Sequence, residues 1–128
     1  MSYYISKMLT MPFDEAVSRA TEALKNEGFG ILTEIDVSAT LKKKISVDFP
    51  NYRILGACNP TLAYEALKLE NKVGTMLPCN IVVRDAGNGQ MEVAAIDPVA
   101  SMQAIDNPAL KQAAMQVRTK LEKVIAEL

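Results

Sequence analysis

Histidine and tryptophan are both absent from the 128-residue chain, and aromatic side chains make up only 5% of it. Without histidine, the chain cannot form Ser-His-Asp or Cys-His nucleophile pairs, histidine-bearing zinc sites or histidine-ligated haem. The scarcity of aromatic rings argues against a stacking platform for single-stranded nucleic acid. The net charge of −1 provides no broad positive field that would attract nucleic acid or an anionic membrane.

Long apolar runs are also absent. The first ten residues lack the apolar stretch of a signal peptide, and no segment approaches the ~20 apolar residues that span a membrane. We therefore expect a cytoplasmic protein whose two cysteines are reduced. The sequence has the length and apolar content of one ordinary domain, without repeats or linkers, so residues 1–128 are expected to fold as a single domain.

Hydrophobic periodicity predicts five strands and two long helices, with two short helices between them. The expected elements are strands at 2–10, 29–37, 52–58 and in a hairpin over 81–96, long helices at 11–27 and 108–128, and short helices near 38–46 and 60–69. This order, β-α-β-β-β-β-α with the short helices inserted, predicts an α+β fold: one mostly antiparallel five-stranded sheet with both long helices on one face.

Several polar residues are expected to begin helices. Thr10 and Ser38 precede apolar stripes at helical spacing and are predicted N-caps. Asn59 is followed by Pro60, which combines a capping side chain with a proline suited to the first helical turn.

Alternation along the strands predicts that one face of the sheet is partly polar. Glu34, Asp36, Arg84 and Glu92 fall on the face opposite the long helices. That face is therefore expected to be wetted by solvent or covered by a second subunit.

The two cysteines both stand directly before an asparagine. Cys58 ends a strand and precedes Asn59, while Cys79 and Asn80 begin the next strand. If these strands are antiparallel neighbours, the thiols lie at one end of the sheet, together with Asp97 from the last strand. If residues 51–86 form a parallel crossover instead, the thiols lie at opposite ends.

The stretch "YRILGACNPTLAYEALKLENKVGTMLPCNIVV" resembles the domain-of-unknown-function 302 family. That family has the same Cys-Asn-Pro at a strand-to-helix junction, followed by a Gly-x-x-Leu-Pro-Cys-Asn stretch. Segments on both sides agree as well, including "TEIDVSATLKKK" and Asp97-Pro98 with Met102. The resemblance implies a TATA-binding-protein-like α+β fold, antiparallel strands beside the two cysteines and a homodimer. It implies no particular activity or cofactor.

Two functional hypotheses follow for the paired cysteines. The first is a small module that binds a small ligand or a soft metal near Cys58, Asn59, Cys79, Asn80 and Asp97. Two thiolates are too few to close a structural zinc site, so further ligands would be needed. A metal would be held by Cys58 and Cys79 as first ligands.

The second hypothesis is thiol exchange or sulfur transfer, with Cys58 as nucleophile and Cys79 as resolving thiol. The position of Cys58 before a helix N-terminus can lower a thiolate pKa below its free value of ~8.5. A third interpretation is that both cysteines are small buried residues with no chemistry, as free cysteines usually are.

Other candidate residues have simpler explanations. Met76, Met91, Met102 and Met115 are expected to fill the core or an interface rather than bind copper. Asp97 precedes Pro98 and is expected to start a helix or turn.

Overall fold

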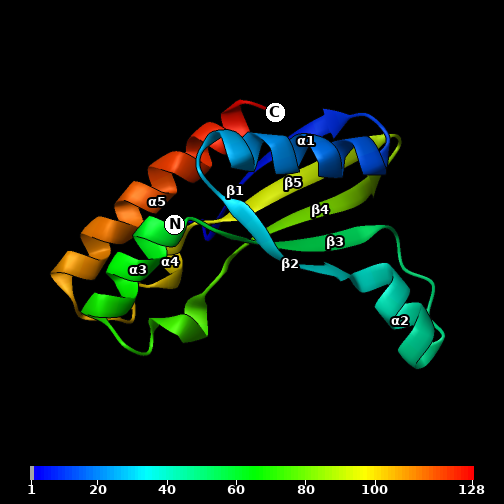
Figure 1. Ribbon diagram of the computed structural model, residues 1–128. Helices are drawn as coiled ribbons and strands as arrows, with labels where there is room; N and C mark the ends of the chain where they lie inside the picture. Colours follow the sequence, from blue (N-terminus) through cyan, green and yellow to red (C-terminus); the bar gives the residue numbers. More distant parts are fainter. Residues whose placement is uncertain (1) are drawn as a thin grey trace.

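The computed structural model describes residues 2–128, which contain one five-stranded sheet (Figure 1). The strands lie in the order β1-β5-β4-β3-β2, and every neighbouring pair is antiparallel. They are β1 (Tyr4–Thr10), β2 (Gly30–Asp36), β3 (Tyr52–Cys58), β4 (Cys79–Gly87) and β5 (Gln90–Ile96). The predicted α+β class and the predicted antiparallel sheet are confirmed.

Two long helices cover one face of this sheet, as the sequence predicted. The helices are α1 (Phe13–Asn26), α2 (Val37–Ile45), α3 (Pro60–Leu69), α4 (Pro98–Ser101) and α5 (Pro108–Ala126), with a 3-10 turn η1 (Val73–Met76). The long helices α1 and α5 lie over the strands, whereas α2 projects from the far end of the sheet (Figure 1). No helix within residues 2–128 is long and apolar enough to cross a membrane.

The main core lies between the sheet and the helices α1 and α5. Strands β4 and β5 alternate, so that Ile81, Val83 and Val93 are fully buried while the residues between them face the other side. The stripe of α1 contributes small residues such as Ala16 and Ala20, which let the helix approach the strands closely. A smaller cluster forms beneath α3 and α5, from Ala66, Val73, Met102, Leu110 and Ala114.

The predicted caps of α1 and α2 are wrong. Thr10 ends strand β1, and its hydroxyl accepts a hydrogen bond from Gln90 Nε2 at 2.7 Å, while α1 begins after Pro12 without a side-chain cap. Asp36 caps α2 by accepting from the Ala39 amide at 2.9 Å, and Ser38 donates to the same carboxylate. A carboxylate accepts more strongly than a hydroxyl, and it stands two residues earlier.

A β-bulge in β2 overturns the predicted facing of two acidic residues. The register shifts between Ile31 and Thr33, so that Glu34 pairs with Leu55 and Asp36 with Arg53. Both acids therefore lie on the helix side of the sheet, where they form ion pairs with Arg53. Arg53 Nη1 lies 3.2 Å from Glu34 Oε1, and Arg53 Nη2 lies 3.5 Å from Asp36 Oδ2. One inserted residue reverses the alternation of everything beyond it.

The other two charged residues lie where the sequence predicted. Arg84 and Glu92 are a cross-strand pair on the face away from the helices, and Arg84 Nε lies 2.7 Å from Glu92 Oε1. We call this side of the sheet the open face.

The packing of α5 on the sheet makes a direct test possible. Leu121 is fully buried, so Leu121→Ala is expected to lower the free energy of unfolding by about 2–5 kcal/mol, because truncation leaves a cavity. Denaturant titration followed by far-UV circular dichroism measures the change. Met115→Ala, at an exposed site on the same helix, is the control and should change stability by less than about 0.5 kcal/mol. Equal stability of both variants would contradict this packing.

Candidate functional site

The antiparallel pairing of β3 and β4 brings the two cysteines to one end of the sheet. Ala57 is directly opposite Cys79, so Cys58 is the next residue along β3. The crossover alternative for residues 51–86, which would have separated the thiols by the length of a strand, is therefore ruled out. Both cysteines are free thiols.

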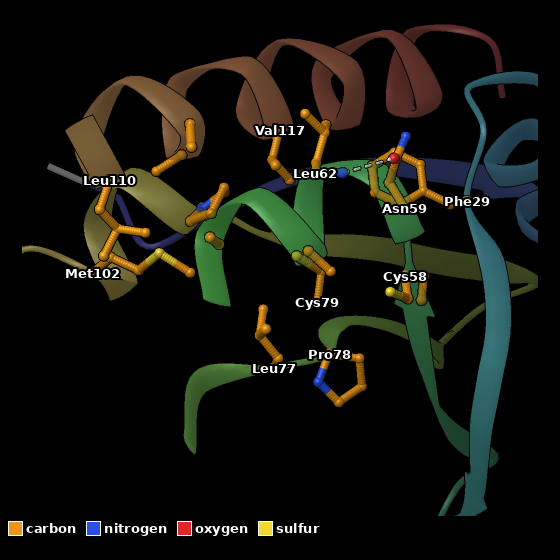
Figure 2. Close-up of a pocket in the computed structure, with 16 residues that line it drawn as sticks. Phe29, Cys58, Asn59, Leu62, Leu77, Pro78, Cys79, Met102, Leu110 and Val117 are labelled. Carbon is orange, nitrogen blue, oxygen red and sulfur yellow. Dashed lines mark hydrogen bonds between the residues drawn. The ribbon is translucent and has the colours of Figure 1, made fainter. Parts of the chain in front are cut away.

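A cavity of about 40 Å³ lies at this end of the sheet, between the strand ends and the helices α3 and α5 (Figure 2). Its wall is almost entirely hydrocarbon and sulfur, and it consists of Phe29, Ala57, Cys58, Asn59, Leu62, Ala63, Ala66, Leu77, Pro78, Cys79, Pro98, Met102, Leu110, Ala113, Ala114 and Val117. Figure 2 shows Cys58 and Asn59 at one end, and Met102 and Leu110 at the other. We call this space the cysteine cavity.

The two thiols differ in their surroundings. Cys58 is half-buried, whereas Cys79 has only 8% of its surface exposed. Burial, and next the neighbouring Cys58, raise the pKa of the Cys79 thiol to about 11. At pH 7 only about one Cys79 side chain in ten thousand would then carry a charge. Cys79 is therefore a neutral, apolar part of the wall.

Asn59 has a structural role, as a helix cap. Its side-chain oxygen accepts a hydrogen bond from the Leu62 amide at 3.3 Å, and Pro60 occupies the first turn of α3. The side-chain nitrogen of Asn59 lies 3.1 Å from the position that a Cβ on Gly28 would take. Gly28 has φ +84° and follows α1, so Asn59 also fits the start of α3 against the end of α1.

Asp97 is buried but does not line the cysteine cavity. Its Oδ1 accepts from the amides of Val99 at 2.9 Å and Ala100 at 3.4 Å, which caps α4 as the sequence suggested. Its Oδ2 lies 3.5 Å from Arg118 Nε on α5. The neighbouring Pro98 lines the cavity instead.

Asn80 faces away from the cysteine cavity. It pairs with Gly56, and its side chain is exposed on the open face beside Arg84 and Val82. Successive residues of a strand point to opposite faces, so Cys79 and Asn80 cannot serve one site on the sheet. The five predicted site residues thus separate into Cys58, Asn59 and Cys79 at the cavity, with Asp97 and Asn80 elsewhere.

Sequence reasoning missed the walls that α3 and α5 contribute. Leu62, Leu110 and Val117 belong to apolar stripes at helical spacing, a pattern that by itself indicates only core packing. Met102 was expected to fill the core or an interface. The signal available in the sequence was the pair Ala113-Ala114, because adjacent small residues on a helix leave room beside it.

Gly56 was also missed, although the chain requires a glycine there. A Cβ at this position would lie 2.8 Å from Pro78 Cγ and would also meet the hydroxyl of Thr33. The backbone of β3 therefore runs directly against the proline that precedes Cys79.

The arrangement contains few metal ligands. Within residues 2–128, no group of three or more His, Cys, Asp or Glu side chains is placed to hold a metal ion. The two thiols are the only members of those residue types among the cavity-lining residues described above.

The raised pKa of Cys79 can be tested by alkylation. In the variant Cys58→Ser the remaining thiol stays buried, so its rate with iodoacetamide should keep rising through pH 9 to 10 without levelling. The same variant unfolded in urea is the control, and its rate should level as the pH passes the free value of ~8.5. A native rate that levels below pH 9 would contradict the burial argument.

Comparison with known proteins assigns the chain to a family. A family model described as "Domain of unknown function DUF302" matches residues 5–128. A crystal structure described as an uncharacterized conserved protein DUF302 from Bacillus stearothermophilus has a TM-score of 0.91 and 30% sequence identity, over 99% of this chain and 98% of that one. No curated protein matches the sequence significantly. The resemblance seen in the paired Cys-Asn motifs is confirmed, and the chain belongs to the DUF302 family.

Proposed function

We propose that this chain binds a small uncharged molecule, or the apolar end of a larger one, in the cysteine cavity. The observation that carries the proposal is the chemistry of the wall, which is hydrocarbon and sulfur apart from Asn59. The Asn59 side-chain oxygen already accepts from the Leu62 amide, so the cavity presents little that would bind a charged group. An apolar pocket of this kind binds by excluding water and by close contact.

The size of the cavity limits what fits without rearrangement. An engineered apolar cavity of roughly 150 Å³ is known to hold benzene. A volume of about 40 Å³ suits a xenon atom or a methyl-sized to ethyl-sized group instead. A longer ligand would have to enter with its terminal carbons between α3 and the segment Leu77-Pro78.

The two alternatives for the cysteines are less well supported. A soft metal would have to replace the protons of both thiols, and a pKa of about 11 at Cys79 opposes that loss. Thiol exchange needs a resolving thiolate, which the same raised pKa makes scarce at neutral pH. A cytoplasmic location, which we also propose, would keep both thiols reduced.

Xenon is the probe for this cavity. Methyl NMR spectra under xenon pressure should show shifts at Leu62, Leu110 and Val117, because their side chains line it. Ala63→Leu fills the cavity from α3 and should abolish these shifts. Ala126→Leu, at an exposed site on α5, should leave them unchanged.

Two results would count against the proposal. Xenon shifts that persist in Ala63→Leu would place binding elsewhere in the protein. Stoichiometric binding of silver(I) that is lost in Cys58→Ser, without any xenon shift, would favour the metal alternative.

We further propose that two copies of the chain pair through the surface formed by β2, α2 and residues 46–49. This stretch of chain carries five exposed large apolar side chains, which are Leu32, Ile35, Ile45, Val47 and Phe49. Helix α2 has no buried residue, and it projects from the end of the sheet (Figure 1). An apolar surface of this kind is typical of an interface. The sequence suggested the open face for pairing. That face carries the ion pair of Arg84 and Glu92, so it is more polar at this point than the surface proposed here.

Sedimentation velocity tests the pairing. The protein should sediment at twice its 14.0 kDa chain mass at micromolar concentration. Phe49→Glu should weaken the dimer at least tenfold, because it introduces a charge into an apolar contact. Met115→Glu, at another exposed apolar site, on α5, is the control. A 14.0 kDa species at all concentrations would refute the homodimer.

A further inference from the structure

The open face of the sheet carries a second hollow, which differs from the cysteine cavity in size and in lining residues. It has a volume of about 420 Å³ and is formed by β3, β4, β5 and the start of β1. Three tyrosines line it, and Val82 and Ala94 contribute apolar surface. Asn80 and Arg84 supply polar groups. The tyrosines are Tyr3, Tyr4 and Tyr52. This size lies in the range of ligand pockets, which is roughly 300–1,000 Å³.

The strand register explains why the sheet is hollowed here. Side chains directly opposite each other form rows across the strands. On β4, β5 and β1 the middle row consists of the short side chains Val82, Ala94 and Ser6, and on β3 it continues with the larger Ile54. One flanking row contains Tyr52 paired with Arg84. The other contains Tyr4 paired with Ile96. The short side chains of the middle row therefore leave a trough over β4, β5 and β1, between two rows that carry larger side chains.

Arg84 gives the trough its polar end. Its Nε lies 2.7 Å from Glu92 Oε1, and its side chain is 42% exposed. Among the contacts of residues 2–128, this ion pair is the one that engages the Arg84 side chain, and it uses a single nitrogen. The terminal nitrogens of the guanidinium remain for a ligand, and that pair of donors matches the two oxygens of a carboxylate.

Glu92 restricts the charge that the ligand can carry. Its carboxylate is largely buried beside Arg84, so the local charge sums to zero before any ligand binds. Glu92 would repel a phosphate or another dianion more strongly than a monoanion. Repulsion therefore lowers the binding affinity of a monoanion less. The apolar floor and the tyrosine rings favour a flat hydrocarbon body.

We propose that this trough binds a planar organic monocarboxylate of one or two rings. The ring body lies over Val82 and Ala94, between Tyr4 and Tyr52, and the carboxylate binds the terminal nitrogens of Arg84. The side-chain amide of Asn80 is placed to bind a polar substituent. This site is independent of the cysteine cavity, so it stands whether or not that cavity binds a ligand.

The probe is 2-naphthoate, with the neutral 2-naphthamide as its matched comparison. Titration followed by amide NMR should move the signals of residues 82–84 and 92–96, and naphthamide should bind at least tenfold more weakly. Arg84→Gln should reduce the affinity for naphthoate at least tenfold. Arg19→Gln removes an exposed arginine from α1 and should leave the affinity unchanged.

A second variant keeps the proposal testable if Arg84→Gln does not fold. Ala94→Leu fills the middle row without changing any charge, and it should abolish binding of both probes. Equal affinity for naphthoate and naphthamide, or unchanged affinity in Arg84→Gln, would overturn the proposal. The proposal also fails if Arg84→Gln dissociates a dimer while naphthoate moves no signal on the open face, since a second copy would then cover the trough.

Discussion

The burial of one face of the sheet beneath α1 and α5 is the interaction on which the rest of the structure depends. The central strands β4 and β5 place Ile81, Val83 and Val93 on that face, where α1 and the Leu121 turn of α5 cover them completely. Apolar burial is the main favourable contribution to folding, and here it is one-sided. Because both long helices lie on this side, the other face of the sheet is left uncovered by α1 and α5. The protein therefore has two distinct surfaces at which binding can be considered, an enclosed end and an open face.

This one-sided burial also decides what the Cys-Asn motifs can do. At the second motif the pleat of β4 directs Cys79 toward the helices and Asn80 toward the open face, although the two residues are adjacent. At the first motif β3 ends, so Asn59 leaves the sheet and caps α3. The same residue pair thus has different roles at its two occurrences. The two occurrences stand at neighbouring strand ends, and Cys58 and Cys79 are the members that both line the cysteine cavity.

The fold could be predicted from the sequence because strand and helix periodicities are strong in β4, β5, α1 and α5. The Asn59 cap was predictable for a local reason, since Asn-Pro has few other uses at a strand end. The facing of Glu34 and Asp36 was not predictable, because the bulge at Ile31–Thr33 leaves no mark in the alternation of residue types. Asp97 was correctly expected to start a helix. That Pro98 rather than Asp97 lines the cysteine cavity depends on how α4 packs on α5, a contact between segments that periodicity does not specify.

Gly56 connects the enclosed end of the sheet to its open face. The segment before β4 crosses so close to β3 that any side chain at Gly56 would meet Pro78 and Thr33. Pro78 therefore lies against β3 directly before Cys79, which enters the sheet opposite Ala57. Cys79 then becomes part of the cavity wall, and burial there raises the pKa of its thiol to about 11. The neutral state of Cys79 follows from its burial at the strand end, and this neutrality is one support for the proposal that the cysteine cavity takes an apolar ligand.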